Sequence, residues 1–144
     1  MTCHNPGTTD ANSGNSVDMT VLVHKIHAGS SLANGYKIWG FRNSLHDYST
    51  VNFTKDLDNC TVCHTGGGTD EANWANVPTR EACGSCHDDV NFDTGLNHAN
   101  GIVPGPGNDF CIQCHPATNL PTAVTVAHVG GARTAEGNLY SGAD

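Results

Sequence analysis

The chain has 144 residues, a formal net charge of −8, and few large apolar side chains. Valine, leucine, isoleucine and phenylalanine together number 26, or 18%, which is below the level from which protein cores are ordinarily built. Composition and charge therefore exclude a conventional α/β enzyme, a coiled coil and a transmembrane segment, and they disfavour binding to nucleic acid. The remaining possibilities are a disordered segment or a fold whose core is not made of protein alone.

The first predicted element is a helix over Ser16–Ala28, with the sequence SVDMTVLVHKIHA. Ser16 or Asp18 serves as its N-cap, and Gly29 ends it. Further along, His46 falls in a loop-like stretch, and the alternating run over residues 123–127 predicts a short strand.

Six of the seven cysteines form three C-x-x-C pairs, and histidine follows each pair directly. The three motifs are CTVCH (60–64), CGSCH (83–87) and CIQCH (111–115). Chance would place histidine after all three pairs with a probability of about 2 × 10⁻⁴, so the haem c attachment pattern C-x-x-C-H is a specific assignment. The predicted attachment residues are Cys60, Cys63, Cys83, Cys86, Cys111 and Cys114, and the predicted proximal iron ligands are His64, His87 and His115.

The spacing within each motif predicts a short helical turn. Two cysteines three residues apart lie on one side of such a turn and can form thioethers along one porphyrin edge. The histidine that follows then reaches the iron from below the ring. Thr79, Asp109, and Asp56 or Asp58 are the predicted N-caps of these turns.

Cys3 and His4 match the second half of a fourth motif, whose first cysteine would precede Met1. Three interpretations stay open. The pair belongs to a fourth motif, it holds a haem through a single thioether, or it binds no haem. The sequence thus predicts three haems c, and four if Cys3 and His4 hold one.

Five histidines lie outside the motifs, and they are His24, His27, His46, His98 and His128. Only two methionines are present, so His/Met ligation cannot serve three or four irons. The count favours bis-histidine haems, which are coordinatively saturated and transfer electrons. His24 and His27 share a helix face with Cβ atoms about 5–6 Å apart. They are too close to flank one haem, which predicts that they ligate two different haems. One ligand and one solvent-facing histidine is the alternative.

Other uses of the cysteines explain less of the pattern. Zinc ribbons take C-x-x-C pairs two by two, so three pairs leave a remainder, and they need no histidine after each pair. Disulfides leave the histidines unexplained. A thiol redox motif belongs to a thioredoxin-like βαβ unit, which the sequence does not show.

Longer strings extend the pattern beyond the motifs. They are CHNPGTTD (3–10), VHKIHAG (23–29), REACGSCH (80–87), FDTGLNHANG (92–101) and DFCIQCH (109–115). Over residues 3–130 their order and spacing resemble the outer-surface decahaem cytochromes of metal-reducing bacteria, the MtrC/OmcA type. The stretch is similar to haems two to five of one pentahaem domain, although the first haem's motif and any β-barrel domain are missing.

The resemblance implies a multihaem cytochrome c fold that is mostly coil, with a few short helices around stacked haems and little β structure. It also implies that His24, His27, His46 and His98 are distal ligands. His128 would be the fifth, or would reach the missing first haem. Residues 1–144 are expected to form one multihaem domain, standing alone or as a piece of a larger pentahaem or decahaem protein.

The expected function is electron transfer rather than catalysis, outside the cytoplasm of a bacterium, at the cell surface or in the periplasm. Other multihaem cytochromes or copies of the same chain are expected partners, and metals, minerals or flavins are candidate acceptors. Two alternatives remain. A multihaem reductase needs one haem with an open distal position. A haem-lined filament needs a spare histidine that ligates the neighbour's haem.

Overall fold

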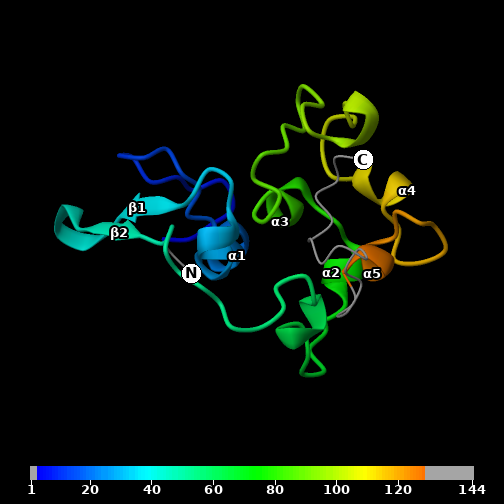
Figure 1. Cartoon of the computed structure of the whole chain (residues 1–144), viewed down its shortest axis with the longest axis horizontal. Helices are drawn as coiled ribbons and strands as arrows, with labels where there is room; N and C mark the ends of the chain where they lie inside the picture. Colours follow the sequence, from blue (N-terminus) through cyan, green and yellow to red (C-terminus); the bar gives the residue numbers. More distant parts are fainter. Residues whose placement is uncertain (1–2, 129–144) are drawn as a thin grey trace. The chain divides into compact units, whose positions relative to one another are not determined.

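The computed structural model describes residues 3–128, which fall into two compact units. The first unit contains the residues up to Thr54 together with Glu81–Asp89, and the second contains Lys55–Arg80 and the residues from Val90 on. The helices and strands, in chain order, are α1 (Met19–Ala28), η1 (Gly29–Ser31), β1 (Lys37–Trp39), η2 (Phe41–Asn43), β2 (Leu45–Asp47), η3 (Cys60–Val62), α2 (Asn73–Asn76), α3 (Arg80–Cys83), η4 (Ala99–Gly101), α4 (Cys111–Cys114) and α5 (Val124–Ala127). The described chain is therefore mostly coil with short helices and little β structure, as predicted (Figure 1). Within this part, no helix is long and apolar enough to cross a bilayer.

Helix α1 is the only element of the described chain longer than four residues, and its two ends follow from the sequence. The Asp18 carboxylate accepts a hydrogen bond from Thr20 N at 2.8 Å, so Asp18 is the N-cap. At the other end Gly29 has a φ of 41° and donates its N–H to Lys25 O. A Cβ at Gly29 would also collide with the Val51 carbonyl oxygen, so glycine meets both the conformational and the steric requirement there.

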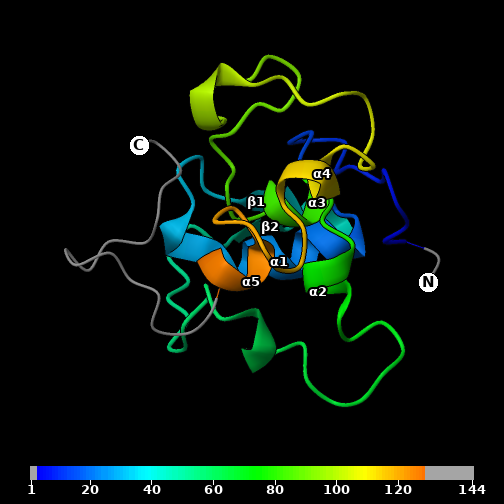
Figure 2. The ribbon, with the colours of Figure 1, turned by 90° about the vertical axis from the view of Figure 1, so that its right-hand side faces the viewer.

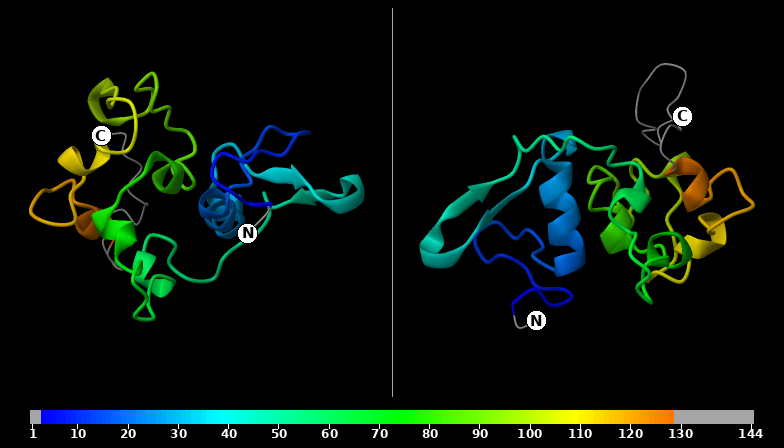
Figure 3. Two further views of the ribbon diagram at one scale, coloured as in Figure 1. Left: turned by 180° about the vertical axis from the view of Figure 1, so that it is seen from behind. Right: turned by 90° about the horizontal axis from the view of Figure 1, so that it is seen from below.

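The first unit has a small apolar core between α1 and a β-hairpin, which lie side by side in Figures 1 and 3. Leu22, Ala28, Leu32 and Tyr36 are buried in it, and Tyr48 packs against them. Tyr36 is fully buried and donates its hydroxyl to Ser16 O at 2.6 Å. Burial raises the pKa of Tyr36 to about 12.

Strands β1 and β2 pair antiparallel, with Ile38 opposite His46. Arg42 and Asn43, both with positive φ, form the turn between them. His46 thus lies in a strand, and the prediction of a loop at this position was wrong. Strands of three residues carry too little alternation to be detected in the sequence.

The second unit has almost no protein core. Among its described residues, only Ala75, Pro78 and Ala123 are buried apolar side chains. Helices α2 and α5 lie next to one another in this unit (Figure 2). Helix α5 occupies the residues predicted as a short strand, so that prediction was wrong. The backbone N–H of Ala127 reaches Ala123 O, and five residues are too few for an alternating pattern to exclude a helical turn.

Two predicted N-caps were also wrong. Asn59, not Asp56 or Asp58, caps η3 by accepting from Thr61 N at 3.2 Å, because it directly precedes the first cysteine. Phe110 occupies the cap position of α4, and no side chain caps that helix, because Asp109 lies one residue too early. Helix α3 begins at Arg80, as predicted.

Candidate cofactor-binding site

All three C-x-x-C-H motifs fold into the same kind of helical turn. In each, the backbone N–H of the histidine donates to the carbonyl of the first cysteine, at 2.9 Å for His64, 2.9 Å for His87 and 2.8 Å for His115. This i to i+4 bond closes one turn of helix and brings both cysteines to the same side of it. The predicted attachment turns are therefore present at all three positions.

Hydroxyl side chains fasten two of these turns, one from within its motif and one from outside it. In the CGSCH turn, the buried Ser85 hydroxyl donates to Glu81 O. In the CIQCH turn, Thr122 acts twice, because its hydroxyl donates to Cys114 O and its carbonyl accepts from His115 Nδ1 at 3.0 Å. Thr122 therefore orients both the second cysteine and the histidine of that motif.

The seven cysteines all lie in the described residues, and they form no disulfide there. Cys3, Cys63, Cys83, Cys86 and Cys114 are exposed, while Cys60 and Cys111 are half-buried. No three Cys, His, Asp or Glu side chains of residues 3–128 gather into a cluster that fits a metal ion, which is the arrangement a closed zinc site needs. The cysteines are thus presented outward in pairs.

Six of the nine histidines are oriented in the same way, by a hydrogen bond between Nδ1 and a backbone carbonyl. The pairs are His4 with Val17 O, His24 with Thr20 O, His27 with Val23 O, His98 with Ile102 O, His115 with Thr122 O and His128 with Val124 O, at 2.6–3.1 Å. A carbonyl only accepts, so Nδ1 carries the proton and the lone pair is on Nε2. Metal-binding histidines are oriented in this way, with the second ring nitrogen bonded to a carbonyl or carboxylate.

His46 differs from these six histidines. Its Nε2 lies 3.0 Å from Ser44 Oγ, and Ser44 Oγ donates its own proton to Phe41 O at 2.9 Å. The Ser44 oxygen therefore accepts from His46, which places the proton of His46 on Nε2. The ring also stacks on Tyr48, with 6.5 Å between ring centroids. In this conformation His46 does not present a lone pair on Nε2.

His98 and His115 are brought together although they are 17 positions apart in the sequence. Their ring centroids are 6.2 Å apart with an interplanar angle of 53°. Phe92 contacts His98 edge to face at 5.8 Å. An open hollow of about 580 Å³ lies beside His98 and is lined by Thr94, Gly95, Leu96, Asn97, His98 and Gly101. Within each motif, by contrast, the cysteines and the histidine are close because they belong to one helical turn.

Large apolar side chains of the second unit are exposed in the segments that carry these two histidines. Leu96 is 63% exposed and Val103 56%, and Phe110 and Ile112 at the CIQCH turn are also exposed. Apolar side chains that flank a hollow, and a unit with almost no core of its own, fit a large apolar cofactor. Together with paired outward cysteines and oriented imidazoles, these residues fit haem c.

Asp88, directly after the CGSCH turn, was missed in the sequence analysis. Its carboxylate, 4% exposed, accepts from the backbone N–H groups of Ala33 at 2.9 Å and Asn34 at 3.0 Å, and it pairs with Lys25 Nζ at 3.7 Å. Lys25 lies between His24 and His27 on α1. Asp88 thus connects an attachment turn to the helix with the two predicted distal ligands. Its position after the motif was the only signal in the sequence.

The chain is similar to known multihaem cytochromes over most of its length. The family model of MtrC/MtrF-like outer membrane cytochromes, domains II/IV, matches residues 1–130. The multiheme cytochrome MtrC of Shewanella baltica (strain OS185) is 29% identical over 116 residues, which is 79% of this chain and 13% of that protein.

Two solved structures are also similar to the chain. The outer membrane decaheme cytochrome OmcA superposes with a TM-score of 0.60 at 26% identity, over 88% of this chain and 19% of that one. MtrC from Shewanella baltica OS185 gives a TM-score of 0.48 at 28% identity, over 81% of this chain and 15% of that one. The chain therefore spans less than a fifth of the length of the relatives it matches.

These relatives are named as multihaem or outer membrane cytochromes, which confirms the predicted family of multihaem cytochromes and the predicted extracytoplasmic location. The chain belongs to the family of MtrC/MtrF-like outer membrane cytochromes, and its residues 1–130 correspond to their domains II/IV.

Proposed function

We propose that the chain conducts electrons through closely packed bis-histidine haems. Haem c supplies one-electron chemistry, and the chain supplies covalent attachment, axial ligands and a fixed orientation for both. The attachment residues are those of the three motifs, at Cys60 and Cys63, Cys83 and Cys86, and Cys111 and Cys114. The proximal ligands are His64, His87 and His115.

The observation that carries this proposal is the pair His98 and His115. A ligating imidazole nitrogen is about 2 Å from its metal, so two rings on opposite sides of one iron have centroids about 6 Å apart. The observed separation is 6.2 Å. Both rings have Nδ1 bonded to a carbonyl, which leaves the lone pair on Nε2. His98 is therefore the distal ligand of the haem held by the CIQCH turn.

His24, His27 and His128 have the same carbonyl contact at Nδ1 and are proposed as further distal ligands. His46 needs a different rotamer or loss of its Ser44 bond before Nε2 can ligate. At the N-terminus, Cys3 and His4 are proposed to hold a fourth haem, because the His4 ring is oriented by Val17 O as the other ligands are. We also propose that residues 1–144 act as one multihaem domain of a larger pentahaem or decahaem protein.

Spin state tests the pairing of His98 with His115. His98→Ala and His115→Ala should each convert one haem from low to high spin, as measured by electron paramagnetic resonance and visible spectra. Because both residues are proposed to ligate the same iron, the double variant should lose no more low-spin haem than either single variant. His87→Ala combined with His98→Ala serves as the additive control and should lose two. Additive loss in the His98 and His115 double variant contradicts the pairing.

Charge supports cationic or metallic electron acceptors. The chain has a net charge of −8, and four ferric haems with ionised propionates would bring it to about −12. Partner cytochromes, further copies of the chain, and metal, mineral or flavin acceptors are the proposed partners. Electron transfer to a small cationic acceptor should slow as ionic strength rises, measured by stopped-flow absorbance. A rate that is independent of salt contradicts electrostatic recruitment.

A further inference from the structure

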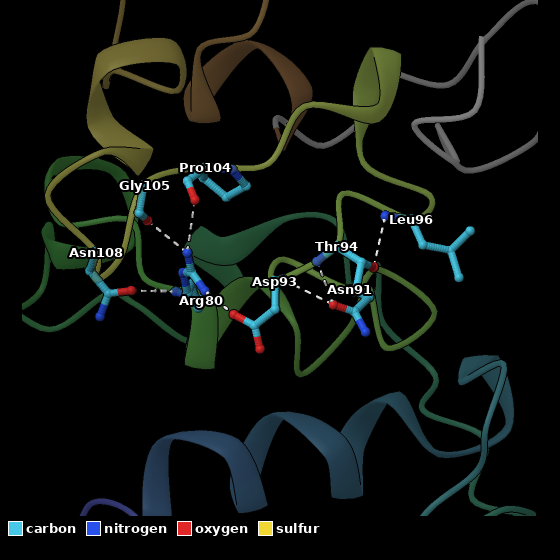
Figure 4. Close-up of polar contacts among 8 residues, drawn as sticks. All are labelled: Arg80, Asn91, Asp93, Thr94, Leu96, Pro104, Gly105 and Asn108. Atoms are coloured by element: carbon cyan, nitrogen blue, oxygen red, sulfur yellow. Dashed lines mark hydrogen bonds and ion pairs between the residues drawn. The ribbon is translucent and has the colours of Figure 1, made fainter.

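Arg80, the first residue of α3, has a guanidinium group that is largely enclosed by the loop 91–108. One terminal nitrogen donates to Asp93 Oδ1 at 2.9 Å. The other donates to Gly105 O at 2.7 Å and to Pro104 O at 3.3 Å. The Arg80 backbone N–H donates to Asn108 Oδ1 at 2.8 Å. Figure 4 shows these partners around the Arg80 side chain.

The loop itself is ordered by local bonds, so the partners of Arg80 occupy defined positions. Asn91 Oδ1 accepts from the backbone N–H groups of Asp93 at 2.9 Å and Thr94 at 3.0 Å (Figure 4). In addition, Asn91 N donates to Leu96 O at 2.9 Å. The guanidinium also lies over the Phe92 ring, 5.9 Å from its centroid. Arg80 is therefore held on several sides.

One donor of this group is left without an acceptor. Arg80 Nε is buried and has no hydrogen-bond partner among the described residues. A buried unpaired N–H is rare in native proteins, because it loses its bond to water and gains nothing in return. Charged donors lose most by such burial. The unpaired donor therefore indicates that a further acceptor, anionic by preference, is needed beside Arg80.

The surroundings of Arg80 identify that acceptor. Phe92, which contacts the guanidinium, also contacts the His98 ring, and His98 lies 6.2 Å from His115. Arg80 is thus connected through the Phe92 ring to His98, a proposed ligand of the iron at the CIQCH turn. The anionic groups of haem c are its two propionate carboxylates, and arginine binds carboxylates with strong charge-assisted hydrogen bonds.

We propose that Arg80 Nε–H binds a propionate of the haem attached at Cys111 and Cys114, which makes Arg80 a positioning residue that tunes that haem. This inference rests on the proposed function, because it requires a haem at this motif. A cation beside the propionate disfavours the extra positive charge of the ferric state and so raises the reduction potential of that haem.

Potentiometric titration of the haem-loaded protein tests this inference. Arg80→Gln should shift the midpoint potential of one haem to a lower value and leave the others unchanged. Arg80→Lys retains the charge and should shift it less. Asp93→Asn is the matched control, because it breaks the Asp93 ion pair but leaves the Arg80 cation and its Nε–H. It removes a negative charge, so the same haem should stay at its potential or move to a higher one.

Unchanged potentials in Arg80→Gln, with all haems bound, would overturn the inference and leave the proposed function standing. Unchanged haem content after Cys111→Ala and Cys114→Ala would instead contradict the proposed function. Should Arg80→Gln fail to bind haem, redox-difference infrared spectra decide the question, with ¹³C-labelled propionates in the wild type and Arg80→Lys. A carboxylate band that differs between the two supports the contact, and identical spectra overturn it.

Discussion

Asp88 shows how a single carboxylate can connect two parts of a cofactor site. It directly follows the CGSCH turn, and its two carboxylate oxygens accept hydrogen bonds from the backbone N–H groups of Ala33 and Asn34. Lys25, its ion-pair partner, is 15% exposed and also lies over the Tyr36 ring, 5.8 Å from the centroid. The carboxylate therefore holds the attachment turn against the end of α1 and the core behind it.

Asp88→Ala should lower the free energy of unfolding by about 2–4 kcal/mol, because it leaves two backbone N–H groups and a half-buried lysine without their acceptor. Denaturant unfolding of the haem-loaded protein, followed by circular dichroism, measures the change.

Asp70→Ala is the control for this substitution. The Asp70 side chain is exposed and accepts a long hydrogen bond, of 3.3 Å, from the Asn73 side chain, so the free energy of unfolding should change by less than about 0.5 kcal/mol. Equal effects of the Asp88 and Asp70 substitutions would show that Asp88 does not hold the turn in place.

Individual residues were predictable from the sequence where the governing interaction is local. Asp18 and Gly29 mark the two ends of α1 through contacts within a few positions, and both were predicted. Asp88 and Arg80 were not, because their partners lie 54–63 positions away for Asp88 and 13–28 for Arg80. Such contacts depend on how the coil folds back, which no local pattern encodes.

Helix α1 has the clearest functional consequence at the scale of elements. His24 and His27 both donate Nδ1–H to the carbonyl four residues earlier, so both imidazoles are oriented by the helix itself. Their lone pairs lie on Nε2, and the rings are too close in sequence to flank one iron. One rigid helix thereby fixes two proposed haems at short separation, which favours fast transfer between them.

His24→Ala and His27→Ala should each convert a different haem to high spin, and the double variant should lose two low-spin haems. Electron paramagnetic resonance with spin quantitation provides the measurement. If the double variant loses only one low-spin haem, then one of these histidines is not a ligand and the helix carries a single haem.

Element type was predictable where a motif imposes geometry and uncertain elsewhere. The three attachment turns follow from the spacing of cysteines and histidine, and all three are present. Strand β2, which contains His46, and helix α5 were assigned wrongly, because a strand of three residues and a helix of four carry almost no periodicity. The sequence predicts which residues make up the site. That His98 and His115 lie close together is visible only in the structure.

At the scale of the whole molecule, the shortage of apolar side chains matches the two kinds of unit. The first unit builds a small core from α1 and the hairpin. The second buries only Ala75, Pro78 and Ala123 as apolar side chains among its described residues. Exposed Leu96 lines the hollow, and exposed Phe110 directly precedes the CIQCH turn where a haem is proposed. An apolar fraction of 18% is then sufficient, because haems complete the core.

The central claim is that each C-x-x-C-H turn holds a covalent haem and that Cys3 holds another. Intact-mass spectrometry of the denatured protein, combined with haem quantitation by the pyridine haemochrome assay, tests it most directly. The account predicts the 144-residue chain with four covalent haems, and three in a Cys3→Ala variant. Three haems in the wild type would contradict the assignment of Cys3. Fewer than three, or a mass that corresponds to the chain alone, would contradict attachment at the motifs.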